Sequence, residues 1–184
     1  MHYMKVRLAI ALVLLLAVAG AASVPAAKPD NNTPDLPSPV CDNLTLPSGT
    51  KLVSRVYARG VQIYRWSGMA WDFVGPLALL FADDGYEGQV GHHYATPNGP
   101  AWESNSGSKV IAARQAGCIP DMSAIPWLLL RAVSTTGPGI FSAVTHIHRV
   151  NTTGGLAPST GGTTVGEVVE VPYTTEYYFY RAQD

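Results

Sequence analysis

From residue 41 onward, the chain alternates between short apolar runs and clusters of turn-forming residues. The runs are rich in β-branched and aromatic side chains, and Gly, Pro, Asn and Asp separate them, which is typical of strands joined by tight turns. No segment keeps a long helical period. The pattern predicts an all-β fold, an antiparallel sandwich or barrel of about ten short strands. The expected strands are residues 51–57, 61–66, 70–74, 77–81, 89–94, a short strand at Trp102, and residues 109–113, 127–133, 141–150, 167–171 and 176–180.

The strand expected over residues 176–180 carries aromatic side chains on both faces. Because successive side chains of a strand point to opposite faces, Tyr177 and Phe179 share one face. Tyr178 and Tyr180 share the other. A strand that is apolar on both faces is either central in a sheet or has its outer face covered by further chain.

Residues 1–22 have the three parts of a cleavable signal peptide. Lys5 and Arg7 give a basic start, an apolar run follows over residues 8–18, and small residues come after it. The apolar run has 11 residues, too few to cross a hydrocarbon core about 30 Å thick as a helix. We therefore expect a secreted, extracellular protein without a membrane span.

Residues 23–40 are rich in proline and predict an extended leader, because proline is excluded from helix interiors and central strands. Residues 41–184 are then long enough for a single β-rich domain. Without the signal peptide, ten basic and thirteen acidic residues remain, and the basic ones form no cluster. This charge pattern argues against nucleic acid and anionic membranes as partners. We expect a monomer that binds a small molecule or a glycan.

Two kinds of covalent modification fit the secretory route. Cys41 and Cys118 are the two cysteines, and in an oxidising compartment such a pair is expected to form one disulfide. Asn31, Asn43 and Asn151 each begin an Asn-x-Ser/Thr triplet and are candidate N-glycosylation sites.

Between residues 50 and 181, the chain carries an ordered series of distinctive strings. They are Gly91-His92-His93-Tyr94, Trp102-Glu103, Ile125-Pro126-Trp127, Thr136-Gly137-Pro138-Gly139, Val144-Thr145-His146-Ile147-His148, Val171-Pro172-Tyr173 and Tyr177-Tyr178-Phe179-Tyr180. The series resembles an uncharacterised family of secreted proteins that is common in filamentous fungi and also present in bacteria. The resemblance implies a signal peptide and a β-rich fold, but no established activity.

Many fungal members of that family carry a malate dehydrogenase label, and this sequence does not support the chemistry. Nicotinamide binding requires a Gly-rich turn from a strand into a helix, whose N-terminus holds the pyrophosphate. The nearest string is Gly137-Pro138-Gly139, with Ser142 where a third glycine is required, and it lies between two expected strands. We therefore expect no nicotinamide site and no organic cofactor.

The chain also departs from the family it resembles. Members often have cysteine where Trp66 and Gly162 stand here, and the joint loss is expected if those two cysteines pair with each other. Members usually have glutamine where His148 stands. A metal site built on His148 would therefore not be a general property of the family.

The histidines nevertheless suggest one alternative function, a metal site or a metal-dependent enzyme. His146 and His148 lie on the same face of one expected strand, a spacing found in β-barrel metal sites, and His93 is a candidate third ligand. Asp72 and Glu103 are candidate carboxylate ligands. No glutamate follows the histidine pair in residues 149–155, and structural or surface histidines are the simpler interpretation.

A second alternative is a carbohydrate-binding or carbohydrate-active module. Exposed tryptophans on a sheet suit sugar stacking, and acidic pairs suit glycoside hydrolysis. The candidates are Trp66, Trp71, Trp102, Trp127, Asp72, Asp83, Asp84, Glu87 and Glu103. Most of the tryptophans are expected in the core, and the sequence shows no nucleophile elbow or other catalytic constellation. Our main hypothesis is therefore a non-catalytic binding or wall-associated module.

Overall fold

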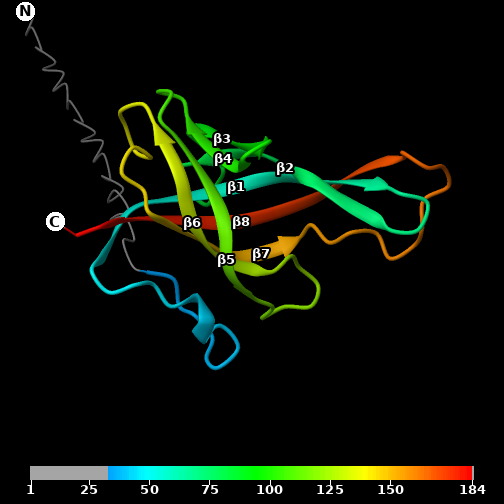
Figure 1. The fold of residues 1–184 in the computed structure, drawn as a ribbon, viewed down its shortest axis with the longest axis horizontal. Helices are drawn as coiled ribbons and strands as arrows, with labels where there is room; N and C mark the ends of the chain where they lie inside the picture. The colour runs from blue at the N-terminus through cyan, green and yellow to red at the C-terminus, as the bar shows by residue number, and fades with distance from the viewer. Residues whose placement is uncertain (1–32, 184) are drawn as a thin grey trace, which may run out of the picture. The chain divides into compact units, whose positions relative to one another are not determined.

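The computed structural model describes residues 33–183, so the predicted signal peptide and most of the predicted leader lie outside the described residues. Eight antiparallel strands pair in sequence order, and β1 also pairs with β8, which closes a barrel (Figure 1). The elements are η1 (Asp42–Leu44), β1 (Thr50–Trp66), β2 (Trp71–Phe81), β3 (Gln89–Thr96), β4 (Gly99–Ser104), β5 (Lys109–Cys118), β6 (Trp127–Thr136), β7 (His146–Gly154) and β8 (Val168–Ala182). The all-β prediction is confirmed, and of its two architectures the chain adopts the barrel. In residues 33–183, no helix has the length and apolarity required to cross a membrane.

The strands are fewer and longer than the sequence pattern predicts, because three expected pairs are each one continuous strand. In β1 the sequence suggests a break near Gly60, but in the structure this glycine lies where β1 and β2 approach each other closely. A Cβ atom at this position would lie 2.1 Å from the carbonyl oxygen of Leu77 on β2. Glycine therefore lets β1 and β2 stay paired instead of ending the strand.

One expected strand begins later than predicted. β7 starts at His146, and Phe141 lies in the preceding connection, where it is fully buried. Its ring packs against that of Phe179, with 4.7 Å between the centroids, and its backbone N–H donates to the hydroxyl of Ser108. The segment 141–144 thus closes one end of the barrel. The sequence pattern alone does not distinguish such a buried connection from a strand.

The barrel interior is filled by alternate side chains of the strands. Its centre is an aromatic layer, in which His93 stacks on Trp102 with 4.3 Å between ring centroids, and Tyr177 meets both rings edge-on. Aliphatic side chains such as Leu80, Leu130 and Ile147 pack around this layer.

The outer face of β6, β7 and β8 is covered by the described N-terminal segment, residues 33–46. Leu36 and Leu46 of this segment pack against a buried cluster that includes Tyr178 and Tyr180. A covered outer face is one of the two arrangements that the sequence allows for a strand with aromatic side chains on both faces.

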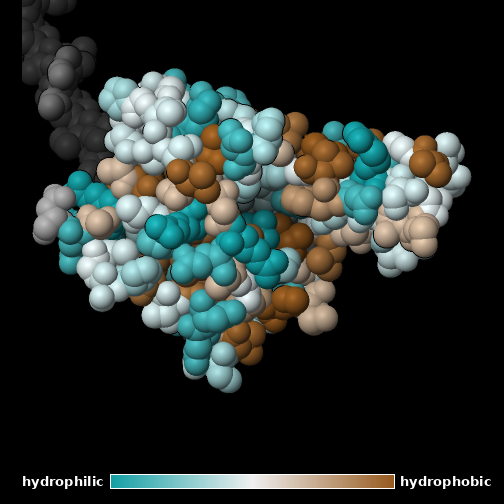
Figure 2. Space-filling view, in the orientation of Figure 1, coloured by the Kyte–Doolittle hydropathy of each residue, from teal (hydrophilic) through white to brown (hydrophobic). Residues whose placement is uncertain are grey.

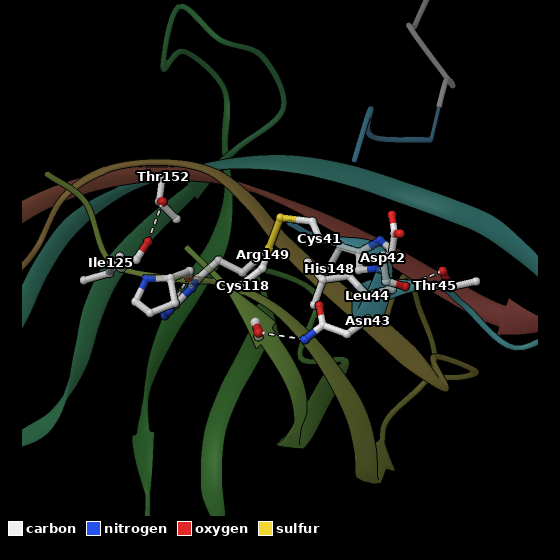
Figure 3. The surroundings of a disulfide bond; sticks show 12 residues. Cys41, Asp42, Asn43, Leu44, Thr45, Cys118, Ile125, His148, Arg149 and Thr152 are labelled. Atoms are coloured by element: carbon white, nitrogen blue, oxygen red, sulfur yellow. Dashed lines mark hydrogen bonds between the residues drawn. A yellow bond between two sulfur atoms is a disulfide. The ribbon is translucent and has the colours of Figure 1, made fainter. Parts of the chain in front are cut away.

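A disulfide fixes the segment to β5. Cys41 and Cys118 are bonded, as predicted, and both are buried (Figure 3). Close to them, the Nε2 atom of His148 lies 2.7 Å from the carbonyl oxygen of Leu44. Because a carbonyl only accepts, His148 donates from Nε2, and its Nδ1 accepts from the hydroxyl of Tyr180 at 3.0 Å.

Beyond the barrel, the β1–β2 hairpin and the β7–β8 connection extend together as an arm, which Figure 1 shows on the right. The N–H of Trp66 donates to the carbonyl of Glu167 at 2.8 Å. A Cβ atom at Gly162 would lie 2.9 Å from the Cβ of Trp66. The two positions where the resemblance implies paired cysteines are therefore adjacent in space.

Candidate functional site

A cavity of about 460 Å³ opens at the end of the barrel opposite Phe141. It lies where β1, β3, β5 and β7 end and where the even-numbered strands begin, and all eight strands contribute to its lining. The walls are largely apolar, formed by side chains that include Phe73, Pro76, Leu128 and Leu130. We call this space the barrel cavity. Figure 2 shows apolar side chains gathering toward the base of the arm, beside a hollow in the visible face.

The floor of the barrel cavity is the aromatic layer of His93, Trp102 and Tyr177. Burial lowers the pKa of His93 to about 3, so its ring is neutral at physiological pH. The Nδ1 atom lies 2.8 Å from the carbonyl oxygen of Ala101 and must donate to it, which leaves Nε2 unprotonated. His93 is therefore a fixed, neutral part of the floor.

Two arginines line the barrel cavity. Arg149 projects from β7 and donates through Nε and Nη2 to the carbonyl oxygen of Pro126, at 3.1 and 2.8 Å. Burial lowers the pKa of Arg149, and repulsion from the nearby Arg114 lowers it further in smaller measure. Arg114 is on β5 and is more exposed. Among residues 33–183, no Asp or Glu lines the cavity.

Three polar atoms of the lining are buried without a partner. They are Nε2 of Gln62, Nε1 of Trp102 and the hydroxyl of Tyr177, and none has a hydrogen-bond partner among the described residues. Burial raises the pKa of Tyr177, while the proximity of Arg149 and Trp102 acts in the opposite direction. These groups are thus close together, yet their geometry does not complete hydrogen bonds between them. Buried polar groups in native proteins are rarely left so.

The structure does not bring the predicted metal ligands together. His146 and His148 share the outer face of β7, as the alternation predicts, and His148 is engaged with Leu44 and Tyr180. His93 lies inside the barrel, on the other side of the wall. No group of three or more His, Cys, Asp and Glu side chains within residues 33–183 is placed to hold a metal ion.

The tryptophans do not form a flat sugar-stacking platform. Trp66 and Trp71 are neighbours on the arm, but their ring planes are inclined by 55°. Trp102 is in the barrel floor, and Trp127 packs beneath the N-terminal segment. The candidate acidic residues Asp72, Asp83, Asp84, Glu87 and Glu103 are absent from the lining of the barrel cavity.

Two of the candidate glycosylation sites can be located. Asn43 and Asn151 are exposed, and Asn43 donates from Nδ2 to the carbonyl of Gly117 (Figure 3). Asn31 lies outside the described residues. Glycosylation itself remains a prediction.

Neither the arginines nor the unpartnered donors of the barrel cavity were predicted from the sequence. One signal was available, since Arg149 continues the alternation that places Ile147 on the inward face of its strand. A charged residue on an apolar face marks a functional position more often than a charged residue on a polar face.

Comparison with known proteins places most of the barrel in one family model. Residues 47–181 match the family described as "Protein of unknown function (DUF3455)". Neither the curated proteins nor the solved structures contain a match to the chain.

Proposed function

The chain belongs to the DUF3455 family of proteins of unknown function, and from this premise we propose that it binds a small, largely apolar molecule in the barrel cavity. The proposal includes an extracellular location, supported by the predicted signal peptide and by the disulfide between Cys41 and Cys118. It agrees with our sequence-based hypothesis of a non-catalytic binding module.

The cavity is the observation that carries the proposal. Its volume of about 460 Å³ falls in the range of about 300–1,000 Å³ typical of small-molecule sites. Its walls are apolar with a few convergent polar groups, the usual composition of such sites. An eight-stranded barrel is also wide enough to hold one small ligand.

Binding is favoured over catalysis by the chemistry of the lining. His93 is a poor proton acceptor because its pKa is about 3 and its Nδ1 proton is held by Ala101. No Ser, Cys, Lys, Asp or Glu of the described residues lines the cavity, and the hydroxyls of Tyr64 and Thr96 are engaged in donating to backbone carbonyls. A pocket of this kind is equipped to hold and orient a ligand.

The proposal is tested with N-phenyl-1-naphthylamine, a neutral dye that fluoresces in apolar surroundings. We expect saturable binding of one dye per protein. Ala95→Trp, at an exposed residue of the cavity lining, is expected to weaken that binding because the indole ring takes up part of the cavity volume. Ala113→Trp is the matched control, since Ala113 is an exposed strand residue outside the lining. No saturable fluorescence, or equal binding by the two variants, would contradict the proposal.

A further inference from the structure

The barrel cavity holds positive charge without a neutralising group. Arg149 and Arg114 reach it from β7 and β5, and no carboxylate from the part of the chain that the structure describes lines it. The ion pairs of the described chain lie elsewhere, between Arg55 and Glu176 and between Lys109 and Glu103. Two guanidinium groups therefore converge on one apolar space with no acidic partner.

This arrangement is unfavourable in the empty protein. A charge removed from water is costly unless a hydrogen-bonded opposite charge accompanies it. Arg149 donates to a neutral group, the carbonyl of Pro126, and lies close to the hydroxyl of Tyr177, while Arg114 adds a like charge nearby. An anion bound between the two would relieve both the desolvation and the repulsion.

The unpartnered polar atoms of the lining favour the same kind of ligand. The indole N–H of Trp102 can only donate, and Nε2 of Gln62 is also a donor. The hydroxyl of Tyr177 can donate as well. All three belong to fully buried side chains, so a group that reached them would itself leave water. Carboxylate oxygens only accept hydrogen bonds, which matches a site composed of donors.

We propose that the ligand is an amphiphilic carboxylate, with its anionic group held by Arg149 and Arg114 and its apolar body against the cavity walls. Planar guanidinium groups suit a carboxylate because they can donate two parallel hydrogen bonds to it. Phe73, Leu128 and Leu130 supply apolar surface for the remainder of the molecule. This inference rests on the proposed function and adds the chemical class of the ligand.

The test compares three molecules of equal chain length in displacing the dye: octanoate, 1-octanol and octylamine. Octanoate is expected to act at a concentration lower by about tenfold than 1-octanol, the lower end of what a hydrogen bond to a charged group contributes. Octylamine is expected to be the weakest of the three. If 1-octanol displaces the dye as well as octanoate does, this inference is wrong while the proposed function stands. If the dye itself does not bind, both are wrong.

Variants then locate the anionic group. Arg114→Met removes one charge from an exposed side chain that makes no hydrogen bond within residues 33–183, so we expect the variant to fold. It should reduce the preference for octanoate over 1-octanol and leave 1-octanol unchanged. Arg131→Met is the control, because Arg131 is an exposed arginine on β6 outside the lining. Arg149→Lys keeps the charge and loses the planar donor pair, so it should also reduce the preference. An unchanged preference in both cavity variants would overturn the inference.

Discussion

Lowering the pH from about 7 to about 4.5 is expected to destabilise the barrel through His93. The side chain is 2% exposed, stacks on Trp102 and holds a neutral ring, because burial lowers its pKa to about 3. In the unfolded chain its pKa returns to about 6.5. Below that value the unfolded state binds a proton that the folded state does not, so acid favours unfolding.

The magnitude follows from the two pKa values. With about 6.5 unfolded and about 3 folded, His93 alone should cost about 2.5 kcal/mol of stability between pH 7 and pH 4.5. That is a large part of the total of about 5–15 kcal/mol expected for a domain of this kind. His146 and His148 act in the same direction, since burial lowers the pKa of both. The carboxylates with lowered pKa, such as Glu103 and Glu167, lose their contribution only as the pH falls below about 4.5.

The assay is urea denaturation over this pH range, comparing the unmodified chain with His93→Gln. Glutamine can still donate to the carbonyl of Ala101 but does not titrate, so the loss of stability on acidification should shrink by about 2.5 kcal/mol. His92→Gln, at the exposed neighbouring position, is the matched control for a histidine-to-glutamine substitution. If His93→Gln and the unmodified chain lose the same free energy between pH 7 and pH 4.5, the assignment to His93 is refuted.

Three further predictions concern the outer layer and the arm. Replacing Cys41 and Cys118 with Ala should lower the free energy of unfolding by about 2–4 kcal/mol, because the bond joins positions 77 residues apart; an unchanged urea midpoint would contradict this. Trp66→Cys combined with Gly162→Cys should form a second disulfide, because the two Cβ positions are adjacent, and titration of the denatured protein should find no free thiol. His148→Gln should retain about 1–3 kcal/mol of stability that His148→Ala loses, since the amide can still donate to the carbonyl of η1; equal denaturation midpoints for the two variants would speak against this.

Local patterns in the sequence were sufficient for the all-β class and the disulfide, and they left a covered outer face as one of two explanations for the strand with aromatic side chains on both faces. They overestimated the number of strands in part because Gly60 has the appearance of a break, whereas the glycine allows a close approach of the paired strands β1 and β2. They extended a strand back to Phe141 because an apolar run that plugs a barrel has the same composition as a strand. In both cases the deciding contact is with a residue distant in the sequence.

The barrel cavity could not be predicted from the sequence for a related reason. Its lining gathers residues from all eight strands, and its polar side chains Gln62, Arg114 and Arg149 come from three different strands. Arg114 and Arg149 are 35 positions apart, and only barrel closure brings them to the same space. The spacing of His146 and His148 is visible in a short stretch of sequence, yet the strand face that carries them points out of the barrel.

The plug at Phe141 has a kinetic consequence for any occupant of the barrel. With that end closed, a ligand enters and leaves through the opposite, open end of the barrel. A substitution at the entrance that only narrows the passage, without filling the cavity as Ala95→Trp does, should slow association and dissociation equally and leave the equilibrium constant unaltered. A substitution at the guanidinium groups should act mainly on dissociation, as is usual for contacts formed after encounter. Stopped-flow measurements can therefore separate residues that only narrow the entrance from residues that hold the bound ligand, a distinction that equilibrium affinities alone do not reveal.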